Sequence, residues 1–323
     1  MDAAIVGLGR WGRNLVNSVE GKSEKLRFVK CVVRQPDSAR EYAAEKGLEI
    51  ETDFDRMLRD ERIQAVVLAT PHSLHVRQIL AAAAAGKAVF CEKPLALTAA
   101  DAERAVEACR RANVTLGLGH DKRLWESMQE LMRISASGEL GQILHIEGHF
   151  SNESTGRYFT GWRAMDDDAP GGGLTATGIH IIDAFVALAG PIRAVHAHVV
   201  SHPPAPDPVD SLTAFLEFSS RVSGVLCGVR TTPAYWRVHV FGKDGSAEAI
   251  GATELTVRRT DTEPERFTFG PVDTLRSELE AFADAASGGA PYYIAPQQMI
   301  DAVAALEATI ESMKSGRTVR VRS

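Results

Sequence analysis

The first twelve residues constrain the fold more than any other stretch of the chain. A short apolar run over residues 3–6 leads directly into Gly7-Leu8-Gly9-Arg10-Trp11-Gly12, and the residues that follow are typical of a helix. This is a GxGxxG pattern between a strand and a helix, the setting in which such a turn binds the pyrophosphate of a dinucleotide. Gly7 allows the turn, Gly9 lets the backbone approach the phosphates, and Gly12 lets helix and strand pack closely. The alternative is a glycine-rich turn that binds nothing.

Strand-like and helix-like segments alternate over the next hundred residues. Buried strands are expected at residues 28–34, 65–70, 88–92 and 114–119, and helices at 38–46, 74–85 and 99–112. Strands that alternate with helices predict a parallel, doubly wound sheet. Its ligand is expected at the carboxyl ends of the strands.

The pattern changes after residue 141. Strands are expected at 143–151, 194–200, 211–219, 223–230 and 237–242, and runs of strands with few helices between them predict an antiparallel sheet. Helices are expected at 123–135, 274–286 and 297–314. We therefore expect two domains, a dinucleotide-binding domain over 1–119 and a substrate-binding and oligomerisation domain over 120–323.

Composition narrows the class of protein. The formal net charge of −6 argues against a nucleic acid or an anionic membrane as partner. No apolar run is long enough to span a membrane, and the N-terminus lacks the plan of a signal peptide. The four cysteines are scattered, which suits a reducing cytoplasm and no metal site. We expect a cytoplasmic protein with a small-molecule substrate.

The end of the second expected strand bears on the choice of cofactor. A site for NAD usually places an acidic residue there, to accept a hydrogen bond from the ribose 2′-hydroxyl. Here the chain reads Val33-Arg34-Gln35-Pro36, with no acid before Asp37. The guanidinium of Arg34 suits a 2′-phosphate, so NADP is favoured and NAD remains the alternative. The other interpretation is an exposed arginine at a strand end.

Several motifs together resemble the Gfo/Idh/MocA family of NAD(P)-dependent oxidoreductases. They are the N-terminal GLGRWG, ATPHSLH at 69–75, Glu92-Lys93-Pro94 after a strand, GELGQILHIEGHFS at 138–151, Trp162-Arg163, and GGG…GIHIID ending at Asp183. A terminal GRTVRV at 316–321 completes the resemblance, which spans nearly the whole chain.

This resemblance implies an α/β protein: a Rossmann doubly wound parallel sheet, then an α/β domain with a large open, mostly antiparallel sheet. It implies hydride transfer between nicotinamide and a hydroxyl or keto group of a sugar, diol or related substrate. It also implies a homodimer or homotetramer, a cis bond before Pro94, and a catalytic Lys93. A lysine at this strand end can hydrogen-bond the reacting oxygen. The residues expected to bind the cofactor are Gly7, Gly9, Arg10, Trp11, Gly12, Arg34, Thr70, Pro71, His75, Glu92 and Lys93.

The stretch GGGLTATGIHIID holds the second catalytic candidate. Thr177 is expected to cap a helix that ends at Gly190, and the helix is apolar on nearly every face, which predicts burial. A buried polar pair must be hydrogen-bonded, so His180 is either a satisfied core residue or a proton-transfer group. The resemblance favours catalysis. Asp183 is expected to orient the imidazole or to hold the helix.

The same stretch departs from the family pattern at one position. Relatives commonly carry an aspartate four residues before the histidine, where this chain has Ala176. That change weakens the expectation of a polyol substrate and favours one with fewer hydroxyls. The residues expected to bind substrate are Arg123, Trp162, Arg163, Thr177 and His180. Asp166, Asp167 and Asp168 are expected to form a solvated acidic run rather than a metal site.

Three functions remain open from the sequence. The leading one is an NADP-dependent dehydrogenase or reductase. The second is a glycosidase of the same family, which keeps NAD bound and uses transient oxidation. The third is a non-catalytic NADP-binding sensor, which the alanine at position 176 makes credible.

Overall fold

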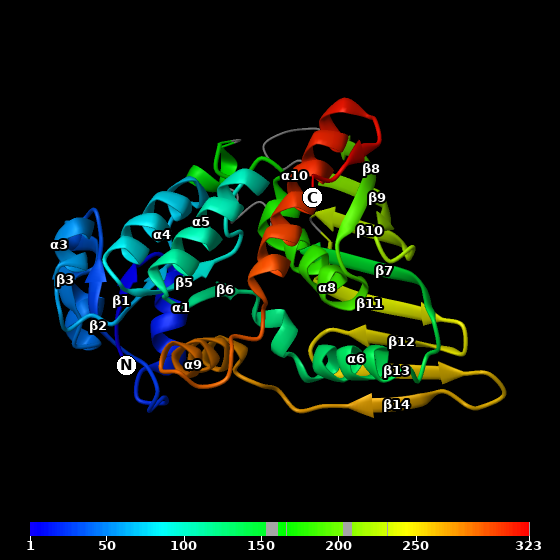
Figure 1. Ribbon diagram of the computed structural model, residues 1–323, viewed down its shortest axis with the longest axis horizontal. Helices are drawn as coiled ribbons and strands as arrows, with labels where there is room; N and C mark the ends of the chain where they lie inside the picture. Colours follow the sequence, from blue (N-terminus) through cyan, green and yellow to red (C-terminus); the bar gives the residue numbers. More distant parts are fainter. Residues whose placement is uncertain (153–160, 166, 203–208, 231, 323) are drawn as a thin grey trace. The chain divides into compact units, whose positions relative to one another are not determined.

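The fold was analysed in a computed structural model of the chain (Figure 1). The structure describes residues 1–152, 161–165, 167–202, 209–230 and 232–322, and for residues 152, 163, 164, 201, 202, 209 and 210 it describes the backbone alone. The chain divides into two compact units. Unit 1 comprises Met1–Ala96, Ala100–Asp121 and Asp273–Pro296; unit 2 comprises Leu97–Ala99, Lys122–Val272 and Gln297–Ser323.

Unit 1 is built on a six-stranded sheet in which every neighbouring pair is parallel. The strand order is β3-β2-β1-β4-β5-β6, which is the doubly wound order of a dinucleotide-binding sheet. The four central strands are almost wholly buried because helices cover both faces. The strands are β1 (Asp2–Val6), β2 (Arg27–Val32), β3 (Glu49–Glu51), β4 (Ala65–Leu68), β5 (Ala88–Glu92) and β6 (Leu116–Gly119).

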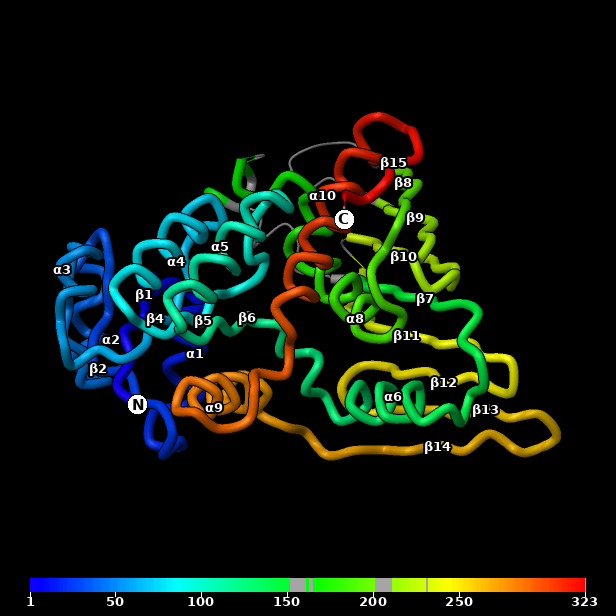
Figure 2. Tube along the Cα trace, viewed as in Figure 1, coloured from blue at the N-terminus to red at the C-terminus, as the bar shows by residue number. Residues whose placement is uncertain are grey.

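The helices of unit 1 come from two distant parts of the sequence. Most follow the strands in turn, but one comes from the far end of the chain and packs on the first helix, as Figure 2 lets the reader trace. Leu279 and Phe282 of that late helix lie in the same apolar core as Leu15. The helices are α1 (Arg10–Val19), α2 (Arg40–Glu45), α3 (Phe54–Leu58), α4 (His75–Ala84), α5 (Ala99–Ala112) and the late α9 (Thr274–Ala286).

This arrangement differs from the expected division at residue 119/120. The first boundary lies two residues later, and Asp273–Pro296 belongs with unit 1 although the sequence places it in the second half. The reason is physical: the apolar face of α9, including Phe282, covers β5 and β6. In particular, the ring of Phe282 packs edge-on against Phe90 with centroids 5.7 Å apart.

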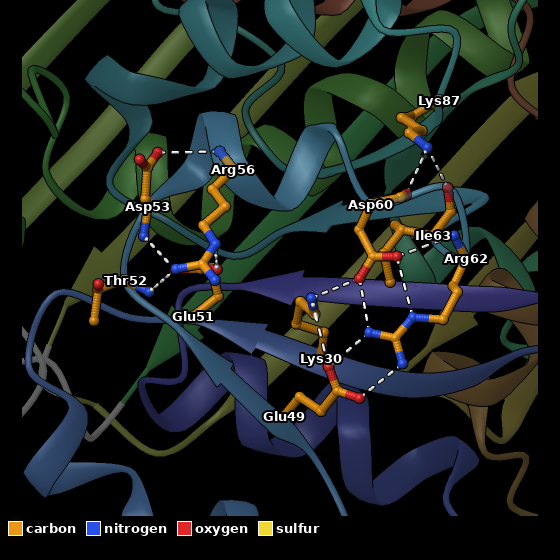
Figure 3. A network of polar contacts seen from close by, with 10 residues as sticks. All are labelled: Lys30, Glu49, Glu51, Thr52, Asp53, Arg56, Asp60, Arg62, Ile63 and Lys87. Carbon is orange, nitrogen blue, oxygen red and sulfur yellow. Dashed lines mark hydrogen bonds and ion pairs between the residues drawn. The ribbon is translucent and has the colours of Figure 1, made fainter.

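A network of charged groups ties the edge of the unit 1 sheet together (Figure 3). Lys30 on β2 donates to Asp60 at 2.6 Å, and Arg62 donates to both Asp60 and Glu49. Lys87 donates to the carbonyl oxygens of Asp60 and Ile63. Hydrogen bonds from Arg62 and then Lys30 hold the pKa of the Asp60 carboxyl well below its usual range.

Unit 2 is built on a nine-stranded sheet of order β14-β13-β12-β11-β7-β10-β9-β8-β15. Neighbouring strands are antiparallel except β7 and β10, which are parallel. The strands are β7 (Ile143–Asn152), β8 (Ile192–His202), β9 (Val209–Phe218), β10 (Ser223–Arg230), β11 (Tyr235–Gly242), β12 (Gly245–Ile250), β13 (Glu254–Arg259), β14 (Glu265–Thr268) and β15 (Val319–Arg320).

Three long helices pack on one face of this sheet: α6 (Glu126–Ser137), α8 (Ile179–Ala189) and α10 (Pro296–Ser315). Helix α6 lies along β12 and β13, and α8 lies against β7 (Figure 1). Alternate residues of the strands, such as Ile146, Leu226 and Val238, join the apolar core beneath the helices. The large open sheet expected from the family resemblance is thus confirmed.

Several elements were missed by the sequence reasoning, and most are short. The strand β3 and the helix α3 of unit 1, and the strands β12 to β14 of unit 2, had no clear apolar run to mark them. By contrast, β5, α5, β10 and α9 have the expected bounds. Within the described residues, no helix combines the length and the hydropathy needed to cross a bilayer.

Candidate active site

The first glycine-rich turn has the geometry of a phosphate cradle. Gly7 has φ +92°, and a Cβ there would lie 2.6 Å from the carbonyl oxygen of Ala69. A Cβ at Gly12 would lie 2.0 Å from the carbonyl oxygen of Gly7. Gly9 differs: a Cβ there would meet no atom within 4 Å, and Gly9 caps α1 without a side-chain hydrogen bond. Open space in front of uncapped helix N–H groups fits a pyrophosphate.

The end of β2 carries positive charge and no available acid. β2 ends at Val32, and Arg34 is exposed. The first acid, Asp37, is exposed and accepts a hydrogen bond from Arg40 at 2.6 Å. The predicted lack of a strand-end acid is therefore also the arrangement seen in the structure.

The ends of β4 and β5 are joined through one buried histidine. The His75 ring lies 3.1 Å from the carbonyl oxygen of Thr70 and 2.8 Å from that of Pro94. The Thr70 hydroxyl donates to Gln78 at 2.6 Å, which fixes the residue before Pro71. The Lys93–Pro94 peptide is cis, as the resemblance implies. His75 thus holds the segment that carries Lys93, a positioning role that the sequence did not distinguish from direct cofactor contact.

Glu92 is a buried carboxyl at the carboxyl end of β5. It is 6% exposed, and its Oε1 has no hydrogen-bond partner. Its carboxylate lies so close to Gly119 that a Cβ there would be 2.9 Å away. Burial raises the pKa of Glu92 to about 7, while the charge of Lys93 and the indole N–H of Trp11 oppose that rise. Trp11, Glu92 and Lys93 therefore form one coupled group at the carboxyl ends of the strands.

In unit 2, the segment before His180 is not capped as predicted. Residues Leu174–Gly178 form a π-helical turn that runs directly into α8, so Thr177 lies inside a helix rather than at its N-cap. The Thr175 hydroxyl instead accepts from the N–H of Gly171 at 3.0 Å. π-Helical turns interrupt regular hydrogen bonding and are frequent at functional sites. The prediction that this helix is buried is confirmed, since His180 is 7% exposed.

Asp183 makes a buried ion pair with Arg123. The guanidinium donates from Nε to Oδ2 at 2.7 Å and from Nη2 to Oδ1 at 2.8 Å, and Nη1 donates to Gln298 at 3.0 Å. The side chains of Arg123 and Asp183 are 5% and 2% exposed. Of the two roles expected for Asp183, this geometry fits holding the helix. Arg123, expected to contact substrate, instead joins its turn to α8 and α10.

Aromatic side chains and a lysine surround His180. The Trp236 ring lies edge-on to the imidazole with centroids 6.5 Å apart, and Trp236 packs against Trp125 with centroids 5.4 Å apart. The ammonium of Lys122 lies 4.4 Å from the ring centroid of Trp125 and 5.6 Å from that of Trp236. We call Lys122, Trp125 and Trp236 the Lys122 cluster. Sequence reasoning missed it because its members are far apart in sequence and belong to no motif.

The glycine triplet packs against an arginine that was also missed. A Cβ at Gly172 would lie 3.0 Å from Nη1 of Arg230, and one at Gly173 would lie 3.2 Å from its Cδ. Arg230 ends β10, an otherwise apolar strand, and that contrast was the available signal.

The remaining predicted residues are only partly described. Trp162 lies half-buried in the 3₁₀ turn Gly161–Ala164, whereas the side chain of Arg163 and all of Asp166 lie outside the described residues. Asp167 is exposed, but Asp168 is 8% exposed, so the prediction of a solvated run is wrong for Asp168. No group of three or more metal-ligating side chains occurs among the described residues.

Comparison with known proteins identifies the two units separately. Residues 1–120 match a family model described as "Oxidoreductase family, NAD-binding Rossmann fold", and residues 128–248 match "GFO/IDH/MocA C-terminal domain". The scyllo-inositol 2-dehydrogenase (NAD(+)) of Bacillus subtilis is 31% identical over 265 residues, covering 77% of this chain and 70% of that protein. The chain belongs to the Gfo/Idh/MocA family.

Other relatives differ in cofactor and in the share matched. The D-xylose 1-dehydrogenase (NADP(+)) 2 of Haloferax volcanii is 28% identical and covers 95% of this chain and 96% of that protein. Against some curated relatives the match spans only about half of their length, as for an uncharacterized oxidoreductase of Streptococcus pneumoniae (27% identical, 58% of this chain, 49% of that protein). A putative NADPH-dependent oxidoreductase from Desulfitobacterium hafniense shares the fold, with TM-score 0.89, 24% identity and coverage of 99% and 97%.

Proposed function

We propose that this protein is a nicotinamide-dependent oxidoreductase that interconverts a hydroxyl and a keto group on a small sugar-like substrate. The observation that carries the proposal is the first glycine-rich turn, where Gly9 faces open space at the uncapped start of α1 while Gly7 and Gly12 pack against backbone. Family membership and the dehydrogenase activities named for the B. subtilis and H. volcanii relatives support it.

The cofactor supplies hydride transfer, and the chain's own residues handle the proton. We assign Lys93 to hydrogen-bond the substrate oxygen, because it follows β5 at the carboxyl edge of the sheet and His75 fixes its backbone through Pro94. We assign His180 to exchange the hydroxyl proton, because an imidazole titrates near neutrality. The ion pair of Arg123 with Asp183 holds the helix that carries His180.

Turnover of the cofactor tests this function. A net change in NAD(P)H absorbance with a panel of sugars, polyols and sugar acids is expected. Lys93→Ala and His180→Asn should each lower kcat by about 100-fold or more, the low end for a general acid–base group, with little change in cofactor affinity. If the two act in one proton-transfer step, the double variant should lose much less than the product of the single losses.

Other outcomes would assign the chain to a different class. Glycoside hydrolysis without net change in the cofactor would indicate the glycosidase. Cofactor binding with neither reaction would indicate a sensor, which the alanine at position 176 would then explain.

For the cofactor itself we propose NADP(H) over NAD(H). Arg34 is exposed at the end of β2, and the one nearby acid, Asp37, is paired with Arg40. Arg34→Ala should weaken NADP(H) selectively by about 10- to 150-fold, corresponding to about 1.5–3 kcal/mol for a charged hydrogen bond. Arg59→Ala, an exposed arginine at the end of α3, is the matched control. Equal affinity of the unmodified protein for both cofactors would refute the preference.

A further inference from the structure

The Lys122 cluster places a positive charge beside His180. The ammonium of Lys122 lies against the faces of Trp125 and Trp236, and Trp236 in turn contacts the imidazole edge-on. Among the residues that the structure describes, Lys122 has no acidic side chain within 4.0 Å. Indole faces attract a cation without neutralising it, so the charge of Lys122 stays available to a ligand.

Hydrogen-bond acceptors near His180 are scarce in the same part of the chain. Both carboxylate oxygens of Asp183 are used by Arg123, and the Thr175 hydroxyl is buried and accepts from Gly171. Position 176 holds an alanine. The indole Nε1 of Trp236 is a buried donor without an acceptor, in a residue that is 7% exposed. The described surroundings of His180 are therefore rich in donors and poor in acceptors.

A second cation lies on the same face of the sheet. Gly228 of β10 and Trp236 of β11 both pair with Phe150 of β7, and Arg230 is two residues beyond Gly228. Because side chains alternate along a strand, Arg230 and Trp236 point to the face that α8 covers. There the glycine triplet leaves room for the Arg230 side chain, since a Cβ at Gly172 or Gly173 would press against it.

This distribution of donors discriminates between classes of substrate. The hydroxyls of a neutral polyol donate as well as accept, so a site that binds them needs acceptors of its own. A carboxylate only accepts, and its hydrogen bonds to lysine or arginine are roughly twice as strong as neutral ones. We propose that the substrate carries a carboxylate, which Lys122 and Arg230 bind, so that the protein acts on a sugar acid or a related hydroxy acid. This inference rests on the proposed function and names its substrate class.

Matched pairs of probes test it on the full chain with cofactor. D-Glucose against D-gluconate and D-glucuronate, and D-xylose against D-xylonate, differ in the acidic group and share a sugar skeleton. We expect kcat/KM to be at least about 10-fold higher for the acidic members, the scale of one charged hydrogen bond. A preference for the neutral members would overturn the inference.

Variants of Lys122 separate charge from packing. Lys122→Met keeps an apolar stem against the two indoles and removes the charge, so the KM of the acid should rise about 10- to 150-fold while that of the neutral sugar stays unchanged. Lys122→Arg should restore much of the loss. Lys243→Met, in the exposed turn between β11 and β12, is the control. Equal losses for acid and neutral sugar in Lys122→Met would show a structural role only and refute the proposal.

A binding measurement keeps the inference distinguishable from the proposed function. Quenching of tryptophan fluorescence by gluconate and by glucose, with NADP present, requires no turnover. Lys122-dependent binding of gluconate without any change in the cofactor would support the inference and refute the oxidoreductase function. Turnover of neutral sugars alone would do the reverse. Absence of both binding and turnover for every acid in the panel would also overturn the inference.

Discussion

Two glycine-rich turns, Gly7–Gly12 in unit 1 and Gly171–Gly173 in unit 2, look alike in sequence but differ in what the glycines face. At Gly7 and Gly12 the nearest atoms to an added Cβ are backbone carbonyl oxygens, at 2.6 and 2.0 Å. At Gly172 and Gly173 the nearest atoms belong to the side chain of Arg230, at 3.0 and 3.2 Å. A backbone fixed in a sheet cannot yield, whereas a long side chain can. The first turn therefore requires glycine, and the second uses it to make room.

The charged groups of the two units differ in a similar way. The network of Lys30, Asp60 and Arg62 is partly exposed, with 59% of the Arg62 side chain accessible to solvent. The pair of Arg123 and Asp183 is nearly inaccessible. A screened network loses little when one partner is removed, whereas a buried charge left alone is costly. The two comparisons predict four substitution effects of decreasing size.

Gly12→Ala should have the largest effect. The added Cβ collides with a carbonyl that β1 and α1 hold in place, so we expect a loss of about 4 kcal/mol or more in unfolding free energy. The thermal shift on adding cofactor should also disappear. Gly9→Ala is the matched control, since its Cβ meets no atom and should leave unfolding unchanged while weakening cofactor binding. A stable Gly12→Ala protein with normal affinity would break the first comparison.

Asp183→Asn should come second. It leaves the buried guanidinium of Arg123 without a counter-charge, which should cost about 3 kcal/mol in chemical denaturation. The exposed Asp167 provides the control Asp167→Asn. Equal stability of the two variants would mean that Arg123 does not hold α8 as described.

Asp60→Asn should cost about 1–2 kcal/mol at neutral pH, because Lys30 is largely buried while Arg62 is screened by solvent. The pKa of Asp60 is depressed in the folded protein, so its carboxylate stabilises the fold above about pH 4, the value of a free aspartate. The difference between the variant and the unmodified protein should therefore shrink as the pH falls below about 4. Denaturation curves at several pH values, with Asp55→Asn as control, measure it. A difference that grows in acid would contradict the assigned role.

Gly173→Ala should have the smallest effect, below about 1 kcal/mol, because Arg230 needs to move by only a few tenths of an ångström. Gly178→Ala sharpens the contrast, since its Cβ would lie 2.7 Å from the buried ring of Phe150. A Gly173→Ala protein as unstable as Gly12→Ala would remove the distinction between the two turns.

The sequence predicts unit 1 better than unit 2, for a physical reason. A dinucleotide-binding turn is a local device, so Gly7, Gly9 and Gly12 can be assigned from twelve consecutive residues. The cis bond before Pro94 and the bounds of β5 likewise follow from a short motif. Around His180 the neighbours come from strands and turns far away in the chain, so Lys122 and Trp236 carry no local signal. The partner of Asp183 was misjudged because helical spacing indicated His180, whereas tertiary packing supplies Arg123.

The origin of α9 has a consequence for the order in which the chain folds during synthesis. Leu279 and Phe282 complete the apolar core of unit 1, yet the 151 residues Lys122–Val272 are made before them. At ordinary rates of translation that interval lasts about 8 to 30 s. Over that time the nascent sheet of unit 1 presents the uncovered side of Phe90 to water and to chaperones. Newly made chains should therefore become resistant to protease in this unit only after residue 296 has left the ribosome.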